Sequence, residues 1–142
     1  MNFDPENNIV QLCAKGMSCE AEGDTKTAAA LFLKAWVEAT NDFERFTSAH
    51  YVARHQETLK EKLKWDQTAL KFALKIKDDA IKTYYPSLYL NIAKCHEDLK
   101  DFHSAKEQYQ IALSYLDFLP EDGYGKMIKS GVYKGMDRIS NC

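Results

Sequence analysis

The residues of this chain that could bind a metal ion or carry covalent chemistry are four histidines and four cysteines. His50 and His55 are five positions apart, which places them on different sides of a helix. His96 and His103 are separated by a predicted turn, and Cys95 points away from its neighbour His96. No two cysteines have the C-x-x-C spacing. Because a metal ion needs ligands that converge on one point, we expect no metal site.

Sequence motifs of enzymes and of cofactor sites are absent as well. The chain has no G-x-S-x-G, H-E-x-x-H or G-x-x-x-x-G-K-S/T pattern. It also has no glycine-rich loop between a predicted strand and a predicted helix, which a dinucleotide or adenosylmethionine site would require. We therefore expect a protein that is not an enzyme and that carries no cofactor.

Length and charge narrow the class of protein further. A chain of 142 residues fits a single domain, residues 1–142, that can bury a core without disulfides or metal. The hydrophobic share of 45% and the charged share of 28% are typical of a folded protein. The net charge of −2, with both signs interspersed, argues against a nucleic-acid partner, which needs a concentrated basic surface.

The sequence gives no sign of a membrane or an exported protein. No stretch approaches the roughly 18 apolar residues that a membrane-spanning helix needs. The first six residues, Met1–Glu6, lack the basic and apolar segments of a signal peptide. Reduced cysteines in the cytoplasm are then the simpler interpretation, so we expect a cytoplasmic location and no membrane partner.

A repeated pattern organises most of the chain. Three residues that can cap a helix, Asp24, Thr58 and Asp101, serve as the reference for an alignment. Twelve positions before each stands a large apolar residue, and eight before each stand Gly16, His50 and Ala93. The positions four, eight and eleven residues after the caps hold Ala28, Lys62 and Ala105; Phe32, Asp66 and Tyr109; and Ala35, Ala69 and Ala112. The repeats span about residues 9–42, 43–76 and 86–119, and nine residues separate the second from the third.

This pattern predicts pairs of antiparallel helices. Small residues are needed where two helix backbones come closest, and large ones fill the remaining gaps. We expect helices at about residues 4–22, 25–40, 42–56, 58–81, 86–99, 102–118 and 124–139, with Asp42 capping the third. The last helix has an apolar stripe of Ile128, Val132, Gly135 and Ile139, which predicts that it covers the end of the third repeat.

The first and third repeats resemble the tetratricopeptide repeat (TPR) family in Gly16, Gly23-Asp24, Ala28, Phe32 and Ala35, and in the aligned residues of the third repeat. The whole chain also resembles small uncharacterised bacterial TPR proteins. The resemblance covers residues 9–119 and implies an all-α fold, a right-handed α–α superhelix of three TPR-like hairpins with a C-terminal capping helix. It implies that the first helix of each repeat lines a concave groove. The function to expect is protein binding by an adaptor or scaffold.

The groove positions implied by the resemblance suggest a partner but do not name one. From the first repeat they are Val10, Cys13, Ala14, Met17, Glu20 and Ala21, and from the later repeats the most informative are Tyr51, Arg54, His55, Ser87, Asn91 and Lys94. Arg54, His55 and Lys94 can donate to carboxylates, so an acidic protein or peptide segment is our hypothesis for the partner. A solvated helix face whose charges pair internally is the alternative. The positions with which family members clamp a terminal carboxylate do not match, and a homo-oligomer remains compatible with the sequence.

The second repeat departs from the pattern on its packed seam. His50 stands where the other repeats have a small residue, and Asp66 stands where they have an aromatic one. We expect the two to interact, with Lys62 or Tyr51 as further partners, because a buried carboxylate needs a partner. A second candidate function follows, a small-molecule or peptide sensor with a pocket between the third and fifth helices under the last one. Its residues would be His50, Asp66, Tyr84, Tyr85, Tyr124 and Lys129.

Overall fold

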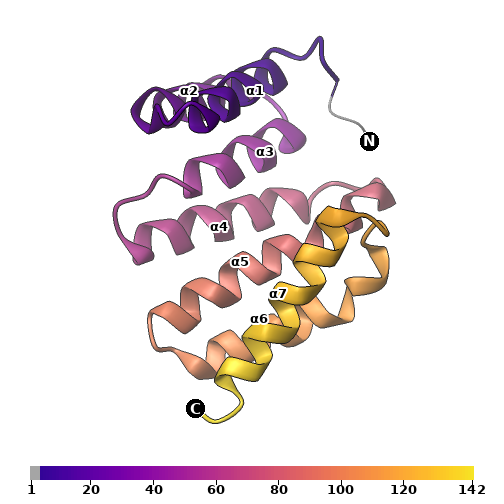
Figure 1. Cartoon of the computed structure of the whole chain (residues 1–142). Coiled ribbons are helices and arrows are strands. Elements are labelled where there is room, and N and C mark those ends of the chain that lie inside the picture. Colours follow the sequence, from indigo (N-terminus) through magenta and orange to yellow (C-terminus); the bar gives the residue numbers. More distant parts are fainter. Residues whose placement is uncertain (1–3) are drawn as a thin grey trace. The chain divides into compact units, whose positions relative to one another are not determined.

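The computed structural model describes residues 4–142, and this part of the chain forms helices and no strand (Figure 1). Met1, Asn2 and Phe3, which belong to the segment tested for a signal peptide, lie outside the described residues. The all-α class predicted from the sequence is therefore confirmed for the described residues. The α-helices are α1 (Asn8–Ala21), α2 (Thr25–Glu38), α3 (Asp42–Ala53), α4 (Leu59–Ala73), α5 (Tyr85–Asp98), α6 (Phe102–Ser114) and α7 (Gly123–Ile139).

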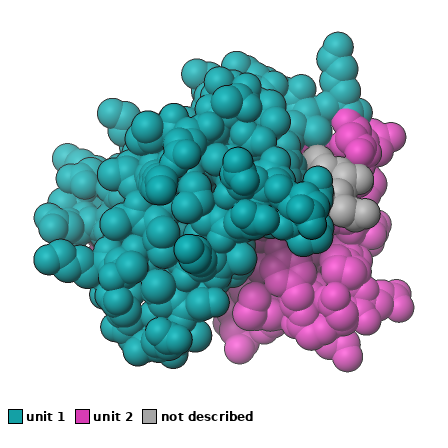
Figure 2. Space-filling model, turned by 90° about the horizontal axis from the view of Figure 1, so that it is seen from above, with its two compact units in different colours: residues 1–77 teal, residues 78–142 magenta. Residues whose placement is uncertain are grey.

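The chain divides into two compact units, coloured separately in Figure 2. Unit 1 covers residues 1–77 and contains α1 to α4, while unit 2 covers residues 78–142 and contains α5 to α7. The boundary falls within the nine residues that separate the second repeat from the third in the sequence. Each unit is described by itself below.

Side-chain caps determine where most of the helices begin. The carboxamide of Asn7 accepts from the amides of Ile9 and Val10, so α1 starts at Asn8 and the start predicted at Asp4 is wrong. Asn41, rather than the predicted Asp42, caps α3. Asp24, Thr58 and Asp101 cap α2, α4 and α6 as the sequence predicts. Asp122 caps α7, and α5 begins without a side-chain cap.

Two helices, α4 and α6, end four or more residues before the positions that the sequence predicts. The helix α4 stops at Ala73, and the residues expected to continue it to Ile81 instead form a separate short 3-10 helix, Asp79–Thr83. The carboxylate of Asp78 caps this turn by accepting from the amide of Ala80. The helix α6 stops at Ser114 and is followed by a 3-10 turn, Leu116–Phe118, because the chain must become extended before Pro120.

The turns of the first and third hairpins have the same backbone conformation. Gly23 and Lys100 both adopt a left-handed conformation, with φ of 83° and 67°. The next residue in each turn, Asp24 or Asp101, donates its amide to the carbonyl five residues back, at 2.8 and 2.9 Å. This arrangement closes the preceding helix and leaves the aspartate side chain to cap the following one.

In unit 1 the core lies between α1, α2 and α3. Phe32 of α2 is fully buried and its ring lies against Gly16 of α1, where a Cβ atom would come within 2.3 Å of the ring. Ala28 and Ala35 are fully buried on the same face of α2. The predicted close contact of small and large residues is therefore present in the first hairpin.

In unit 2 the predicted stripe of α7 is buried against α5 and α6. Ile128, Val132, Gly135 and Ile139 are all buried, and their neighbours in the core include Ala93, Ala105 and Ala112. Gly135 lies against the ring of Tyr109, and a Cβ atom there would come within 2.3 Å of that ring. The last helix thus docks on the α5–α6 hairpin through its apolar side, as the sequence predicts.

Candidate functional site

The candidate site lies on the face that α1 and α3 share in unit 1. Four residues of α1 with helical spacing and two residues of α3 one turn apart line a small pocket there: Val10, Cys13, Ala14, Met17, Thr47 and Tyr51. The pocket has a volume of about 150 Å³ and walls that are almost entirely apolar. These residues include positions that the resemblance assigned to the groove, and the structure brings them together because α1 and α3 pack side by side.

At one end of the pocket, a carboxylate joins the two helices. Glu20 lies one turn after Met17 on α1, and its two oxygens meet Arg54 Nη1 at 3.0 Å and His55 Nε2 at 2.8 Å. The Arg54 guanidinium also lies over the ring of Tyr51, with 4.7 Å from its carbon to the ring centroid. Two predicted donors for an acidic partner therefore already have a carboxylate partner within the unit.

At the other end, a second carboxylate joins the helices. Glu44 of α3 accepts from the Asn7 side chain at 2.9 Å and from both the amide and the hydroxyl of Thr40. Burial by itself would raise the pKa of Glu44, but these hydrogen bonds outweigh it and hold the pKa below its usual value. A polar contact thus lies at each end of the pocket: Glu20 with Arg54 and His55 at one end, and Glu44 with Asn7 and Thr40 at the other.

The thiol in the pocket wall is not a reactive group. Cys13 is buried, and this burial raises the pKa of its thiol to about 12. Because the thiolate is the nucleophile and the metal ligand, a thiol that stays protonated at neutral pH behaves as a small apolar group. The chemistry available at this pocket is therefore apolar contact.

The predicted groove residues of α5 have mostly internal partners. Ser87 is buried, and its hydroxyl donates to the carbonyl of Tyr84 at 3.0 Å. Lys94 donates to Asp98 at 2.6 Å, an i,i+4 pair on an exposed part of the helix. Asn91 is half-buried. Arg54, His55 and Lys94, the side chains predicted to bind an acidic partner, each contact a carboxylate of the chain itself. The acidic partner therefore remains a prediction.

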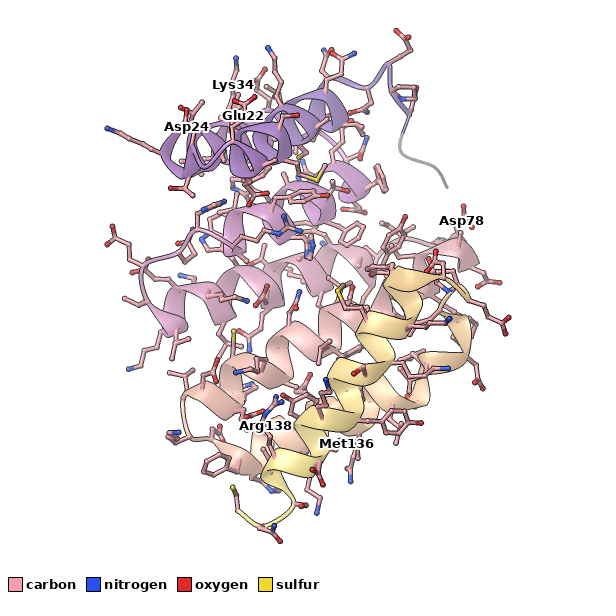
Figure 3. All side chains as sticks on the ribbon, viewed as in Figure 1. Glu22, Asp24, Lys34, Asp78, Met136 and Arg138 are labelled. Atoms are coloured by element: carbon pink, nitrogen blue, oxygen red, sulfur yellow. The ribbon has the colours of Figure 1, made fainter. Side chains whose placement is uncertain are left out.

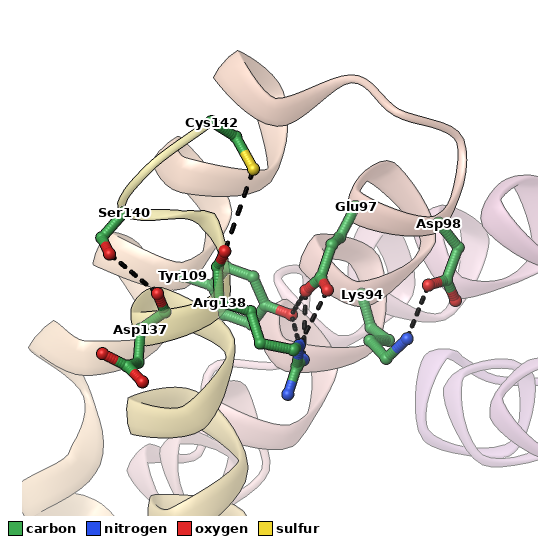
Figure 4. Close-up of polar contacts among 8 residues, drawn as sticks. All are labelled: Lys94, Glu97, Asp98, Tyr109, Asp137, Arg138, Ser140 and Cys142. Atoms are coloured by element: carbon green, nitrogen blue, oxygen red, sulfur yellow. Dashed lines mark hydrogen bonds and ion pairs between the residues drawn. The ribbon is translucent and has the colours of Figure 1, made fainter.

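A hydrogen-bonded cluster in unit 2 was missed by the sequence analysis (Figure 4). Glu97 of α5 binds Arg138 of α7 through two bonds, Nε to Oε2 at 2.8 Å and Nη2 to Oε1 at 3.0 Å, and it also accepts from Tyr109 at 2.7 Å. The hydrogen bond from Arg138 is the main reason why the pKa of Glu97 is lowered. Glu97 thereby fixes α7 to the α5–α6 hairpin.

Glu97 and Glu20 occupy the same position of the repeat. Each stands four residues after the small residue of its first helix, Ala93 or Gly16. Each binds an arginine two helices further along the chain, Arg138 in α7 or Arg54 at the end of α3. The recurrence of glutamate at this repeat position is the sequence feature that could have predicted both ion pairs. The sequence did not indicate which arginine pairs with each glutamate, because Arg54 is 34 residues from Glu20 and Arg138 is 41 residues from Glu97.

Both further partners predicted for the polar residues of the second repeat are present: Tyr51 lies beside His50, and Lys62 forms an ion pair with Asp66, its Nζ 2.7 Å from Oδ2. A direct contact between His50 and Asp66 stays a prediction. The pKa of His50 is lowered to about 4, chiefly by burial and further by Arg54 and Lys62, so its imidazole is neutral at pH 7 and forms no ion pair. Its Nδ1 is buried without a hydrogen-bond partner, and its ring meets that of Tyr51 at a centroid distance of 5.2 Å.

The residues of the second candidate pocket belong to both units. His50 and Asp66 are in unit 1, whereas the tyrosines and Lys129 are in unit 2, so that pocket remains a prediction. Within unit 2, Tyr85 is buried beside Tyr89 and Tyr115. Lys129 instead lines a pocket of about 400 Å³ at the connection between α6 and α7. Tyr124 is 40% exposed.

Metal ligands and membrane-spanning helices were sought throughout the described residues. No group of three or more histidine, cysteine, aspartate or glutamate side chains within residues 4–142 is arranged to hold a metal ion. None of the helices in this range is long and apolar enough to cross a membrane.

Comparison of the chain with protein-family models, with curated proteins and with solved structures found no match. The resemblance between the repeats is therefore supported by internal features alone. These are the shared turn conformation, the aspartate caps and the fully buried residues at aligned positions of the first and third hairpins.

Proposed function

We propose that this chain is a TPR-like interaction module, a right-handed superhelix of three hairpins closed by α7. The internal repetition supports this assignment. Phe32 and Tyr109 are both fully buried, and alanines on either side of each are fully buried too. The glutamates at one repeat position both bind an arginine two helices further along the chain, Arg54 at the end of α3 and Arg138 in α7. Hairpins of this kind cannot bury their apolar faces alone and therefore stack.

The proposed activity is non-enzymatic binding of a segment of a partner protein along the first helices of the hairpins. The observation that carries this proposal is the pocket between α1 and α3, which the side chains of the unit leave open. This face has an apolar pocket between two polar contacts, an arrangement that suits an extended peptide segment. The pocket would exclude water around one side chain of the partner, and the polar residues at Glu20 and Glu44 would offer hydrogen bonds.

An acidic segment is the partner that this face favours. Arg54 is 45% exposed on its side chain, so the carboxylate of a partner can reach its guanidinium from solvent. Glu20 would then compete with the partner for Arg54 and His55. The strength of binding would depend on the balance between an internal and an external carboxylate.

Selection from a library of random peptides displayed on phage tests the proposal without knowledge of the natural partner. Enriched peptides would be titrated into ¹⁵N-labelled protein, and we expect the largest amide shifts at residues of α1 and α3. Failure of any peptide to be enriched, or shifts confined to α2 and α4, would overturn the proposed function.

Two substitutions of opposite sign sharpen the test for an acidic segment. Glu20→Gln releases Arg54 and His55 and should increase affinity for an acidic peptide by about two- to fivefold, whereas Arg54→Gln should reduce it. Glu22→Gln is the matched control, because Glu22 is an exposed residue near the end of α1 and changes the net charge equally (Figure 3). An equal effect of Glu20→Gln and Glu22→Gln would show that only net charge matters.

A further inference from the structure

A row of lysines runs along one side of α4. Lys60, Lys64 and Lys71 are four and seven residues apart in the helix, and Lys75 follows its last turn. Residues at such spacing lie on the same side of a helix, and all four side chains are exposed. From first to last, this lysine row extends over about 22 Å, at about 1.5 Å per residue.

The charge of the lysine row is not neutralised within unit 1. In the range 4–142 that the structure describes, no carboxylate forms an ion pair with any of the four ammonium groups. Lys71 and Lys75 lie instead over the ring of Phe72, at 5.7 and 5.0 Å from its centroid. Residues 59–77 contain six lysines and two acidic residues, a net charge of +4, whereas residues 1–58 contain five basic and nine acidic residues, a net charge of −4. The opposite charges of the unit are therefore separated, with the positive ones on α4.

The lysine row is specific to α4 and is not required by the hairpin. Two, six and thirteen residues after the caps, α4 has Lys60, Lys64 and Lys71; α2 has Lys26, Ala30 and Val37; and α6 has His103, Glu107 and Ser114. All nine side chains are exposed, so these positions face solvent in each hairpin. Packing leaves the residue type at such positions open, and packing therefore does not account for the lysines of α4.

Exposed aliphatic side chains accompany the lysine row. The ring of Trp36 in α2 meets that of Trp65 in α4 at a centroid distance of 5.1 Å, so the two helices are neighbours. Each turns its buried residues towards the core of unit 1 and its solvated side away from it. On this outer side Val37 is 75% exposed, and Leu33 and Leu74 are 48% and 52% exposed. We call the lysine row together with Leu33, Val37 and Leu74 the outer face of α2 and α4.

The residue types of the outer face favour an anionic lipid surface over other acidic partners. Protein interfaces are enriched in arginine and aromatic residues and depleted of lysine. Single-stranded nucleic acids stack their bases on aromatic rings, whereas the exposed apolar residues of this face are aliphatic. A lysine near an anionic membrane raises binding by about fivefold, the equivalent of about 1 kcal/mol, and aliphatic side chains enter the boundary between headgroups and acyl chains.

We propose that the outer face of α2 and α4 docks this chain on the surface of an anionic bilayer. The four lysines lie among the acidic headgroups of the lipids, and Leu33, Val37 and Leu74 insert between them. The expectation of no membrane partner rested on the lack of a membrane-spanning segment, which contact with a bilayer surface does not require. The residues that line the α1–α3 pocket belong to neither α2 nor α4, so the two surfaces are separate.

Co-sedimentation of the full chain with large vesicles tests this proposal. Vesicles of phosphatidylcholine with about one third phosphatidylserine should bind the chain, and vesicles of phosphatidylcholine alone should bind it more than about tenfold more weakly. Raising the ionic strength from about 0.1 M to about 0.5 M should weaken binding to the anionic vesicles by about tenfold, because salt screens the lysines. No binding to the anionic vesicles, or equal binding to both kinds, would overturn the proposal.

Paired substitutions locate the contact. Lys64→Gln with Lys71→Gln should lower the partition coefficient by about 25-fold, which is about fivefold for each lysine. Lys15→Gln with Lys134→Gln, at exposed lysines of α1 and α7, changes the net charge equally and should change the coefficient by less than about twofold. Urea midpoints should stay at the wild-type value in both double variants, since all four side chains are exposed. An equal loss of binding in the two would show that net charge alone is measured and would overturn the proposed face.

Val37→Ser tests the insertion of aliphatic side chains. This variant should bind the anionic vesicles about three- to fivefold more weakly, since less apolar area leaves water on binding. Met127→Ser, at a side chain of α7 that is 62% exposed, is the matched control and should bind like wild type. Wild-type binding of Val37→Ser would overturn this part of the proposal.

Two soluble polyanions under the same conditions test the competing partners. Polyglutamate carries the charge of an acidic protein, and a polyuridine oligonucleotide carries that of a nucleic acid. Binding of either at a lower concentration of charge than the anionic vesicles, with loss of that binding in the Lys64→Gln and Lys71→Gln variant, would assign the outer face to that partner and overturn the proposal. The peptide selection reports on α1 and α3, so the proposed function and the bilayer contact stand or fall separately.

Discussion

In the α1–α2 hairpin the two helices meet where the ring of Phe32 lies on Gly16, whereas in the α3–α4 hairpin of the same unit the aligned positions hold Asp66 and His50. Both seams are closely packed, and both residues of α2 and α4 at this position are buried. The first seam is apolar, while the second contains a neutral imidazole and an ion pair between Asp66 and Lys62.

The α3–α4 hairpin accommodates polar residues between its helices because three aligned positions, His50, Lys62 and Asp66, all differ from those of the other hairpins. Lys62 replaces the alanine found at the aligned position of the other hairpins, and it lies one turn before Asp66, where it can neutralise the buried carboxylate. A buried carboxylate left alone would be strongly destabilising. The polar seam is therefore a set of matched substitutions, and its sensitivity to pH should differ from that of the apolar seam.

Gly16→Val should produce the largest loss of stability. Its Cβ would come within 2.3 Å of the Phe32 ring, which is also stacked on the ring of Tyr51, so we expect a loss of about 3 kcal/mol or more in the free energy of unfolding. Urea unfolding followed by circular dichroism measures it. Gly131→Ala is the control, because its nearest neighbour is the movable end of Leu90 at 3.0 Å and the helix gains propensity. A wild-type midpoint for Gly16→Val would contradict the packing described for the first seam.

Copying the apolar seam into the α3–α4 hairpin should stabilise it. The triple variant with His50→Ala, Lys62→Ala and Asp66→Phe reproduces the residues of the other hairpins and should increase the free energy of unfolding by on the order of 2–3 kcal/mol. Asp66→Phe alone should destabilise, because His50 still occupies the space. The single and triple variants are compared by urea unfolding, with exposed Lys64→Ala as the control. Additive effects of the three changes would argue against a matched set.

The neutral His50 predicts a pH dependence that the first seam lacks. Its folded-state pKa of about 4 lies below the unfolded value of about 6.5, so the unfolded chain binds the proton more strongly. The stabilisation is complete above pH 6.5 and is lost as the pH falls towards 4, amounting to about 2 kcal/mol between pH 7 and pH 5. His50→Ala should remove this slope in urea unfolding at the two pH values. His103→Ala, at a side chain 86% exposed, should retain it.

The smallest change in stability is expected for substitutions in the turns of the first and third hairpins. Lys100 adopts the left-handed conformation that Gly23 adopts in the first hairpin. Because a side chain is strained there, Lys100→Gly should stabilise by about 1 kcal/mol, and Gly23→Ala should destabilise by a similar amount. Thermal unfolding of the two variants beside wild type measures both. Changes of the same sign would show that the two turns are not equivalent.

Local spacing was enough to predict most of the helices and their contacts. Caps such as Asp24 and Asp101 act on amides a few residues away, and the buried stripe of α7 depends only on the helical period. The predictions failed where local signals competed, as at Asn7 and Asn41, which cap in place of their neighbours, and at Asp78, which starts a new turn after α4.

What the sequence by itself determined is the all-helical chain and the positions at which helices touch, because both follow from residue type and period. Only the tertiary structure decided that Glu20 binds Arg54 and His55, that Glu97 binds Arg138, and that a pocket opens between α1 and α3. The physical reason is distance along the chain. A side chain finds such partners only after separate helices have packed, and the register of one helix against another is not contained in the spacing of either.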